Sequence, residues 1–477
     1  MSFSDAMTGI APKTFCRHAD EQSLLWRPQT GACTVLEGAE PFLRHIGQRK
    51  RLRTEIVAAI ADEFGLGADE IADDYREFVA PLVEEGFLED SGVSLLPDRD
   101  APSVHNERGE IVSLTEDAFS FDADGNEHDD SWTPLGDFYR RHGLPCELHL
   151  DLTDGCNERC VHCYLPKGSA HYLDRGVVFK VLKEFRKAQG LTVFVSGGEC
   201  MLHRDFAAVL RCARELELNV VVMSNLTMCD GEMVELLKEV EAQFVNVSLY
   251  AVTESIHDGI TQVPGSCCKT KAAIDALLAA GVPVRIATPF MKENQGCVDE
   301  LKAFARERRV HLIPDAEIFG PIDHSCSNRD HALSLPELEK LVSENKDVFA
   351  KEFAEPGRCV PEAKVCDIGD ARLNLDAEGR YYPCDGFHGA IIGDARKDSL
   401  WEVWTGEALN KLRALKNRDF GECETCADRA WCKVCPMRNF NETGDMFTHA
   451  PWRCGAAGVW RRVFGGEREP GNLTQRE

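Results

Sequence analysis

Three cysteines share one short stretch of the chain. Cys156, Cys160 and Cys163 form the run CNERCVHC, with a C-x3-C-x2-C spacing. Thiolates are ligands of iron–sulfur clusters, and three of them bind three irons of a [4Fe–4S] cube. The fourth iron then lacks a nearby protein ligand, which leaves a coordination position for a substrate or cofactor. The alternative is a structural zinc site in which His162 supplies the fourth ligand.

Eight further cysteines lie in the last third of the chain, in two patterns. The first is C-x6-C-x12-G-x4-C, and the second is C-x2-C-x5-C-x2-C followed by one more cysteine. Eight thiols equal two complete four-cysteine sites, with no open position on either. Zinc ribbons are an alternative for this spacing. The eight residues are Cys359, Cys366, Cys384, Cys423, Cys426, Cys432, Cys435 and Cys454.

The other ten of the 21 cysteines have no metal-binding spacing. We expect most of them to be small buried side chains. Cys326 differs because it lies in the polar loop DHSCSNRDH. A thiol in such a loop is a candidate catalytic donor of a hydrogen atom to a substrate radical.

Composition excludes several classes of protein. The chain has 477 residues, a net charge of -26 and 43% hydrophobic residues, which is typical of a folded protein. Its acidity argues against nucleic acid or an anionic membrane as the main partner. No apolar stretch approaches the roughly 20 residues that cross a bilayer, and the N-terminus lacks the features of a signal peptide. The odd cysteine count does not fit a disulfide framework, so we expect a cytoplasmic protein with metal-binding thiols.

The elements that position the three clustered cysteines are predicted to alternate between strand and helix. Short apolar runs separated by amphipathic helices indicate a parallel sheet with chemistry at the C-terminal strand ends. Six strands are too few for a closed eight-stranded barrel, so we predict an α/β fold with a partial (β/α)6 barrel. The predicted strands are 147–152, 192–196, 220–224, 244–250, 284–289 and 310–314, with helices over 175–189, 206–216 and 271–280.

The run CNERCVHCY resembles the signature of the radical S-adenosylmethionine (radical SAM) enzymes, with Tyr164 as the aromatic residue beside the last cysteine. Gly197, Gly198 and Glu199 follow the second predicted strand and match the GGE motif of that family. The resemblance implies that S-adenosylmethionine binds the open iron and yields a 5′-deoxyadenosyl radical, which abstracts a substrate hydrogen. It also implies cofactor-binding roles for these four residues and for two polar residues at later strand ends. Those two residues are Asn225 and Ser248.

The C-terminal cysteines resemble the SPASM extension of radical SAM enzymes, which carries two auxiliary [4Fe–4S] clusters. This chain has two residues between Cys432 and Cys435 where the family usually has three. By resemblance, Cys359, Cys366, Cys384 and Cys435 bind the first auxiliary cluster. The second is then bound by Cys423, Cys426, Cys432 and Cys454. Three [4Fe–4S] clusters and S-adenosylmethionine are therefore the implied cofactors.

The first hundred residues are predicted to form a winged-helix-like unit. Strands are expected at Ser23–Trp26 and Ala32–Leu36, a helix from Thr54, a second helix over about 71–82, and a closing hairpin with Val93–Leu96. The segment also resembles PqqD-like domains, in which the leader of a ribosomal peptide adds a strand to a sheet edge. A basic run over 44–53 would suit an acidic leader. DNA binding is the alternative for such a run.

These observations predict four segments: a PqqD-like leader-recognition domain at 1–98, an acidic linker at 99–145, the barrel at 146–340 and a SPASM domain at 341–477. The combined resemblance implies a radical SAM oxidoreductase that matures a ribosomal precursor peptide, with formation of a thioether or other cross-link. An electron donor such as flavodoxin or ferredoxin is implied. Peptide epimerisation and protein oxidation of the sulfatase-maturase type are alternatives. A winged-helix iron–sulfur or zinc regulator of DNA is the alternative outside this chemistry.

Overall fold

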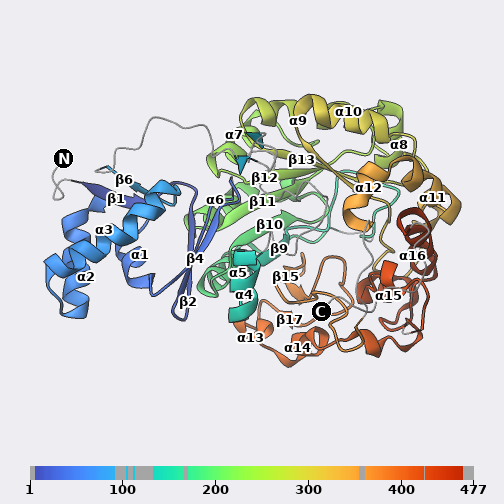
Figure 1. Cartoon of the computed structure of the whole chain (residues 1–477). Coiled ribbons are helices and arrows are strands. Elements are labelled where there is room, and N and C mark those ends of the chain that lie inside the picture. Colours follow the sequence, from blue (N-terminus) through green and yellow to red (C-terminus); the bar gives the residue numbers. More distant parts are fainter. Residues whose placement is uncertain are drawn as a thin grey trace. The chain divides into compact units, whose positions relative to one another are not determined.

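The computed structural model describes residues 6–28, 30–91, 104–105, 111–112, 133–165, 170–353, 360–423 and 425–465. The chain divides into two compact units, Met1–Leu144 and Pro145–Glu477. Figure 1 shows the order of their elements along the chain.

The first unit contains two small antiparallel sheets and packed helices. One sheet has the order β5-β1-β6 and the other has the order β2-β3-β4. The described strands are β1 (Met7–Ile10), β2 (Phe15–Ala19), β3 (Gln22–Trp26), β4 (Cys33–Glu37), β5 (Arg51–Leu52), β6 (Leu88–Asp90), β7 (Val104–His105) and β8 (Ile111–Val112). The helices are α1 (Glu40–Ile46), α2 (Arg53–Phe64), α3 (Ala68–Glu84) and α4 (Thr133–His142).

The two main helices of this unit follow the predicted apolar spacing. Ile56, Val57 and Ile60 of α2 are buried against Ile71 and Tyr75 of α3 in one core. Gly65 ends α2 in a left-handed conformation (φ 66°), which costs glycine little. Strand β6 pairs with β1, and the predicted hairpin partner Val93–Leu96 lies outside the described residues.

The segment predicted as a linker contains helix α4. Its residues Phe138 and Tyr139 are buried, and the helix packs against β3 and β4 of the first unit. The pair lies one turn from Leu135 and from His142, so the helix has an apolar stripe that the surrounding acidic sequence obscures. Most of the remaining segment lies outside the described residues.

The second unit is built on a nine-stranded sheet with the order β14-β13-β12-β11-β10-β9-β15-β16-β17. The first six strands are parallel and follow chain order, which confirms the predicted α/β fold with a partial barrel. They are β9 (Glu147–Asp151), β10 (Thr192–Ser196), β11 (Asn219–Ser224), β12 (Phe244–Ser248), β13 (Val284–Pro289) and β14 (His311–Asp315).

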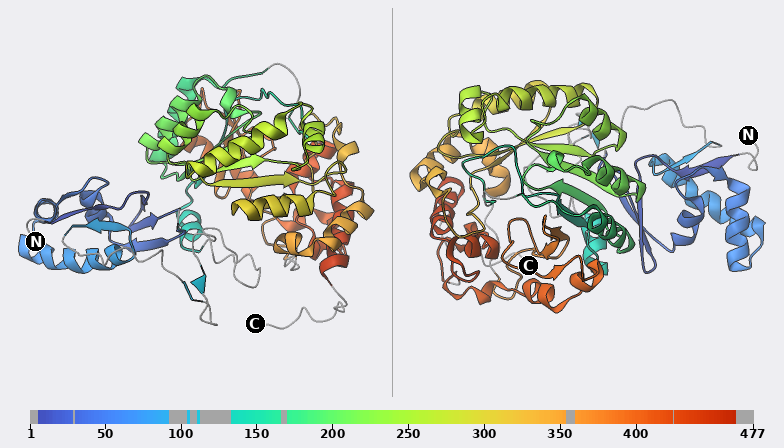
Figure 2. Two further views of the ribbon diagram at one scale, coloured as in Figure 1. Left: turned by 90° about the horizontal axis from the view of Figure 1, so that it is seen from above. Right: turned by 180° about the vertical axis from the view of Figure 1, so that it is seen from behind.

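Helices connect these strands and cover the outer face of the curved sheet (Figures 1 and 2). Val178, Val181 and Leu182 of α5 are fully buried against the strands. Burial at this spacing fixes which face of the helix meets the sheet. The helices are α5 (Arg175–Lys187), α6 (Phe206–Glu215), α7 (Gly231–Glu239), α8 (Glu254–Thr261), α9 (Ser266–Ala279) and α10 (Val298–Arg308).

The C-terminal third continues the sheet instead of starting a new one. Strand β15 (Arg372–Leu375) pairs in parallel with β9, while β16 (Arg380–Tyr382) and β17 (Gly393–Asp394) are antiparallel. This places the β15–β16 turn beside the end of β9. The remaining helices are α11 (Leu335–Glu344), α12 (Lys346–Phe353), α13 (Leu400–Trp404), α14 (Glu407–Arg413), α15 (Pro436–Thr443) and α16 (Pro451–Phe464).

Candidate functional site

The loop that carries the first three cysteines begins at the end of β9. Cys160 donates to Glu158 Oε2 (3.4 Å) and lies 3.7 Å from the Tyr250 hydroxyl. Burial raises the pKa of the Cys160 thiol, and the nearby Glu158 carboxylate and the Cys163 and Cys156 thiols raise it further. Like charges interact in this way only at short range. The structure therefore brings the three predicted ligands together.

The glycines of the GGE motif lie directly against this cysteine loop. Gly198 N donates to Thr153 O (2.7 Å), and Glu199 N donates to Gly155 O (2.9 Å). A Cβ on Gly197 would lie 2.1 Å from Thr153 O, and Gly197 has φ 125°. A side chain at this position is excluded on both counts. The motif was predicted to allow close approach of a ligand, and in the structure it allows close approach of the cysteine loop.

Glu199 is almost fully buried and connects the ends of two strands. Its carboxylate accepts from Met201 N (3.0 Å), Ser224 Oγ (2.9 Å) and Asn225 N (2.9 Å). Burial raises the pKa of Glu199, and these hydrogen bonds oppose the rise. The predicted contact with the methionine ammonium would have to share these acceptor oxygens.

Asn225 reaches the cysteine loop from the end of β11. Its amide nitrogen donates to Asn157 Oδ1 (3.0 Å) and lies 3.8 Å from Cys156 Sγ. Ser248 lies at the end of β12 and its hydroxyl bonds to Tyr250. Both predicted polar residues therefore lie at strand ends near the cysteine loop.

Two aromatic side chains of the loop, Tyr164 and His162, are half-buried. The Tyr164 ring meets Phe319 edge-on, with centroids 5.8 Å apart. The His162 ring meets Tyr250 in the same way at 4.9 Å, and its Nδ1 has no hydrogen-bond partner among the described residues. Burial lowers the pKa of His162 to about 4, so the imidazole is neutral at pH 7.

Two further thiol groups occur in the C-terminal third. Burial raises the pKa of Cys384, and the neighbouring Cys435 and Cys366 add to the rise. Burial also raises the pKa of Cys432 to about 11, where Arg453 and Arg429 lower it while Cys454 and Cys423 raise it. Cys435 therefore lies near Cys384 and Cys366, while Cys432 lies near Cys454 and Cys423. This is the grouping that the SPASM resemblance implies for the two auxiliary clusters. Cys426 is exposed, and Cys359 lies outside the described residues.

The thiols suit iron–sulfur clusters by number and softness. Within the described ranges, however, no three Cys, His, Asp or Glu side chains converge closely enough to enclose a metal ion. The thiols are gathered in groups rather than arranged as closed sites. The ligand assignments remain predictions that fit this grouping.

The unassigned cysteines are mostly buried, as expected: Cys16, Cys146, Cys200, Cys212, Cys267 and Cys297. The Cys326 thiol donates to the carbonyl of Glu442, at 3.8 Å, and its backbone is left-handed (φ 52°). No helix in the described part of the chain is long and apolar enough to cross a membrane.

Family comparisons agree with this arrangement. Residues 150–305 match the radical SAM superfamily, and residues 366–428 match SPASM, an iron–sulfur cluster-binding domain. The chain therefore carries a radical SAM domain followed by a SPASM domain. It is therefore an enzyme whose domains bind iron–sulfur clusters and S-adenosylmethionine.

Three relatives illustrate the range of this radical SAM enzyme's similarity. It is 25% identical to the AdoMet-dependent heme synthase of Methanosarcina barkeri, over 65% of this chain and 96% of that protein. It is 25% identical to the antilisterial bacteriocin subtilosin biosynthesis protein AlbA of Bacillus subtilis, over 62% of this chain and 68% of that one. The structure of Streptococcus suis SuiB bound to precursor peptide SuiA matches with a TM-score of 0.59 at 15% identity, covering 94% of this chain and 100% of SuiB.

Sequence reasoning missed a polar group at the end of β9 in this radical SAM enzyme. Asp151 accepts from the Tyr382 hydroxyl (2.5 Å), and His388 stacks on Tyr382 with ring centroids 4.3 Å apart. A carboxylate at the C-terminal end of the first strand, in ELHLDL, was a signal for Asp151. No sequence signal pairs it with residues more than 200 positions away.

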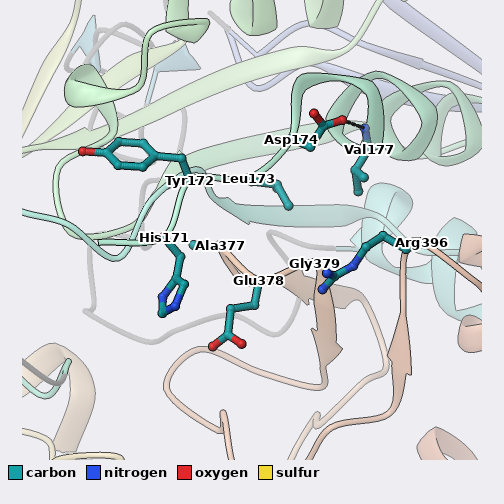
Figure 3. A pocket seen from close by; sticks show the side chains of 9 residues that line it. All are labelled: His171, Tyr172, Leu173, Asp174, Val177, Ala377, Glu378, Gly379 and Arg396. Carbon is teal, nitrogen blue, oxygen red and sulfur yellow. Dashed lines mark hydrogen bonds between the residues drawn. The ribbon is translucent and has the colours of Figure 1, made fainter. Parts of the chain in front are cut away.

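Two pockets flank the β15–β16 turn. The outer one, of about 320 Å³, lies between the turn and the segment that precedes α5 (Figure 3). Asp174, on its wall, already accepts from Gly176 N (2.8 Å) and Val177 N (3.2 Å) as the N-cap of α5. The helix N-terminus is therefore satisfied by the chain itself. The inner pocket is smaller and reaches Asp151 and Gly197.

Proposed function

We propose that this radical SAM enzyme matures a ribosomally made precursor peptide by forming a thioether or other cross-link. The main support is the likeness to SuiB, a protein whose structure holds a precursor peptide, because it extends over 94% of the chain. The similarity to the subtilosin biosynthesis protein supports the same chemistry. The matches to that protein and to the heme synthase cover similar shares of the chain, 62% and 65%, so the likeness to SuiB carries the choice between them.

Three [4Fe–4S] clusters and S-adenosylmethionine are the proposed cofactors, held by the three thiol groups described above. When bound, they supply one-electron reduction and a carbon radical that removes a hydrogen atom from the substrate. The chain's own residues position the ligands: Asn225 and Glu158 contact Cys156 and Cys160, and the glycines of the GGE motif seat the cysteine loop. A full complement predicts about 12 iron atoms per chain.

The N-terminal unit is proposed to bind the peptide leader at strand β6. Strand β6 is an edge of its sheet and packs against α3. Ala11 N donates to Phe87 O and Ser91 N donates to Met7 O, so alternate residues of β6 are turned toward β1. The backbone N–H and C=O groups of Leu88 therefore point away from β1, toward the edge that no other described strand pairs with, and we propose that an extended peptide pairs there.

The basic run gives little support to an acidic leader. Arg44 pairs with Glu40 and Glu63, Lys50 pairs with Glu89, and Arg53 donates to Asp90 (2.8 Å). These side chains are engaged within the unit itself. We therefore propose that leader affinity depends on strand pairing more than on this charge, and that nucleic acid is not a partner.

Mass spectrometry distinguishes cross-linking from epimerisation, the reaction in which Cys326 would donate a hydrogen atom to the substrate radical. Co-expression with the small open reading frames beside this gene, followed by mass spectrometry, tests the proposal. A peptide that loses two hydrogens is the expected result. Unchanged mass with uptake of one deuterium from D2O would instead indicate epimerisation, and no modified peptide would contradict the proposed function.

Two further parts of the proposal concern the cell. No disulfide bond joins the described cysteines, which suits a cytoplasmic enzyme. An external one-electron donor such as flavodoxin or ferredoxin is proposed to reduce the first cluster. Replacing dithionite by purified flavodoxin and its reductase should sustain turnover.

A further inference from the structure

The inner pocket lies where the barrel meets the extension of its sheet. It has a volume of about 70 Å³ and is lined from the strand-β9 end by Asp151 and Thr153, from the GGE motif by Gly197, and from the C-terminal third by Arg380 and His388. At roughly 15–30 Å³ per water, this space holds a few waters or the end of a side chain. Leu165 and Ile322 add an apolar wall.

Asp151 presents a carboxylate to this pocket. Its Oδ2 accepts from the Tyr382 hydroxyl at 2.5 Å, while Oδ1 accepts no hydrogen bond from the described residues. The side chain is only 14% exposed. A carboxylate with one oxygen hydrogen-bonded to the protein and the other oxygen facing a pocket can accept a proton from a ligand.

His388 supplies a second polar atom without a partner. Its side chain is 9% exposed, its Nε2 makes no hydrogen bond with the described residues, and Nε2 lies 3.9 Å from Asp151 Oδ2. Buried polar atoms are normally paired, so an unpaired one lining a pocket points to a missing ligand or water. Tyr382, stacked on His388, holds both groups in place.

We propose that this pocket is where the peptide substrate gives up a proton, with the Asp151 carboxylate as the acceptor. The group deprotonated is the S–H or O–H of a substrate side chain that enters this pocket. Tyr382 and His388 are positioning residues. The proposal rests on the proposed function, since it assigns the acceptor for that reaction.

The cross-linking step balances with this acceptor. A C–H bond and an X–H bond break, and one C–X bond forms. One hydrogen would leave as an atom, which S-adenosylmethionine chemistry would accept. The other would leave as a proton, which passes to Asp151, and as an electron, for which an oxidised cluster held by the proposed thiols would supply the acceptor.

The surroundings of Asp151 suit a base that works near neutral pH. The pKa of Asp151 is raised to about 7, mainly by burial. The Asp385 and Asp376 carboxylates also raise this pKa, whereas the Tyr382 hydrogen bond and His149 lower it. Tyr164 also faces the carboxyl group from the cysteine loop. A base with a pKa near the working pH is most effective.

The first test needs no peptide. Infrared difference spectra of the full-length enzyme minus Asp151→Asn should show a protonated carboxyl band that disappears as pH rises through about 7. The matched control is Glu378→Gln, which changes a carboxylate on the same pocket wall. Its difference spectrum should lack that band. Absence of the band from the Asp151 spectrum would overturn the proposal.

The second test uses the co-expressed peptide found to lose two hydrogens. In Asp151→Asn, cross-linked product should fall by about 100-fold while 5′-deoxyadenosine still forms, as expected for loss of a general base. Glu239→Gln, which changes an exposed carboxylate on α7 that pairs with Arg211, should stay within about twofold of wild type. Tyr382→Phe should move the rising limb of the pH profile to higher pH, because it removes the bond that lowers the pKa of Asp151.

The outcomes separate this proposal from the proposed function. Wild-type levels of cross-link in Asp151→Asn, or equal loss of cross-link and 5′-deoxyadenosine, would overturn the role of Asp151 alone. Absence of any peptide product from the wild-type enzyme would instead contradict the proposed function, while the infrared test would still judge Asp151.

Discussion

At the scale of single residues, the GGE motif at the end of β10 is tightly packed against the cysteine loop. The sequence predicted a functional GGE motif, but the structural demand on Gly197 comes from Thr153 of the cysteine loop. That contact joins two strand ends more than 40 positions apart. A motif indicates that such residues matter, whereas only packing reveals which neighbour excludes a side chain.

Gly197→Ala is expected to lower the midpoint of thermal unfolding by about 5 °C. The added Cβ would meet backbone at 2.1 Å, and its left-handed φ adds strain of about 1–3 kcal/mol. The matched control is Gly231→Ala, whose Cβ would meet nothing within 4 Å at the start of α7. Calorimetry of the two variants measures the difference. Equal unfolding midpoints for Gly197→Ala and Gly231→Ala would show that the cysteine loop can move to accept the added Cβ at little cost in stability.

At the scale of elements, the barrel strands were predictable and the sheet extension was not. Runs such as VVVMS are apolar and β-branched, so their strands follow from local propensity and alternation with helices. The pairing of β15 with β9 joins Arg372 to Glu147, and no local pattern encodes that partnership. Strand β1 was also missed, because four residues of mixed character carry too little signal.

The join between β9 and β15 depends on an ion network. Arg372 Nε and Nη2 donate to Glu147 Oε2 (2.8 and 2.7 Å), and Nη1 donates to Asp385 (2.9 Å). Despite burial, His149 and Arg372 hold the pKa of Asp385 below its usual range. A carboxyl whose pKa is lowered by folding stabilises the fold above its unfolded pKa and loses that effect as pH falls through its folded pKa.

Arg372→Gln is therefore expected to unfold several degrees lower than wild type at pH 7. Because the arginine is 38% exposed, we expect a loss of only about 1–2 kcal/mol. The difference in stability should narrow only below about pH 4, where Asp385 becomes protonated in the unfolded chain while the folded chain still holds it ionised. Arg396→Gln, which removes an exposed ion pair with Asp394, is the control and should change little. A difference in unfolding free energy between wild type and Arg372→Gln that is the same at pH 7 and pH 3 would contradict this role of Asp385.

At the scale of the whole molecule, the two compact units are proposed to have separable tasks. The radical chemistry lies in Pro145–Glu477, while Met1–Leu144 is proposed to hold the leader. Deleting residues 1–144 should reduce peptide modification at least about tenfold and leave uncoupled formation of 5′-deoxyadenosine near wild type. Liquid chromatography of both products measures the ratio. Equal loss of the two activities would contradict leader binding by the first unit.

The central claim is that Cys156, Cys160 and Cys163 hold a cluster that cleaves S-adenosylmethionine. The most direct measurement is anaerobic formation of 5′-deoxyadenosine by the reconstituted chain under reductant, beside a variant with all three cysteines changed to alanine. We predict turnover with about 12 iron atoms per wild-type chain, and in the variant no turnover with about 8 iron atoms. Turnover that survives in the variant, or a colourless wild-type protein with stoichiometric zinc, would contradict the account.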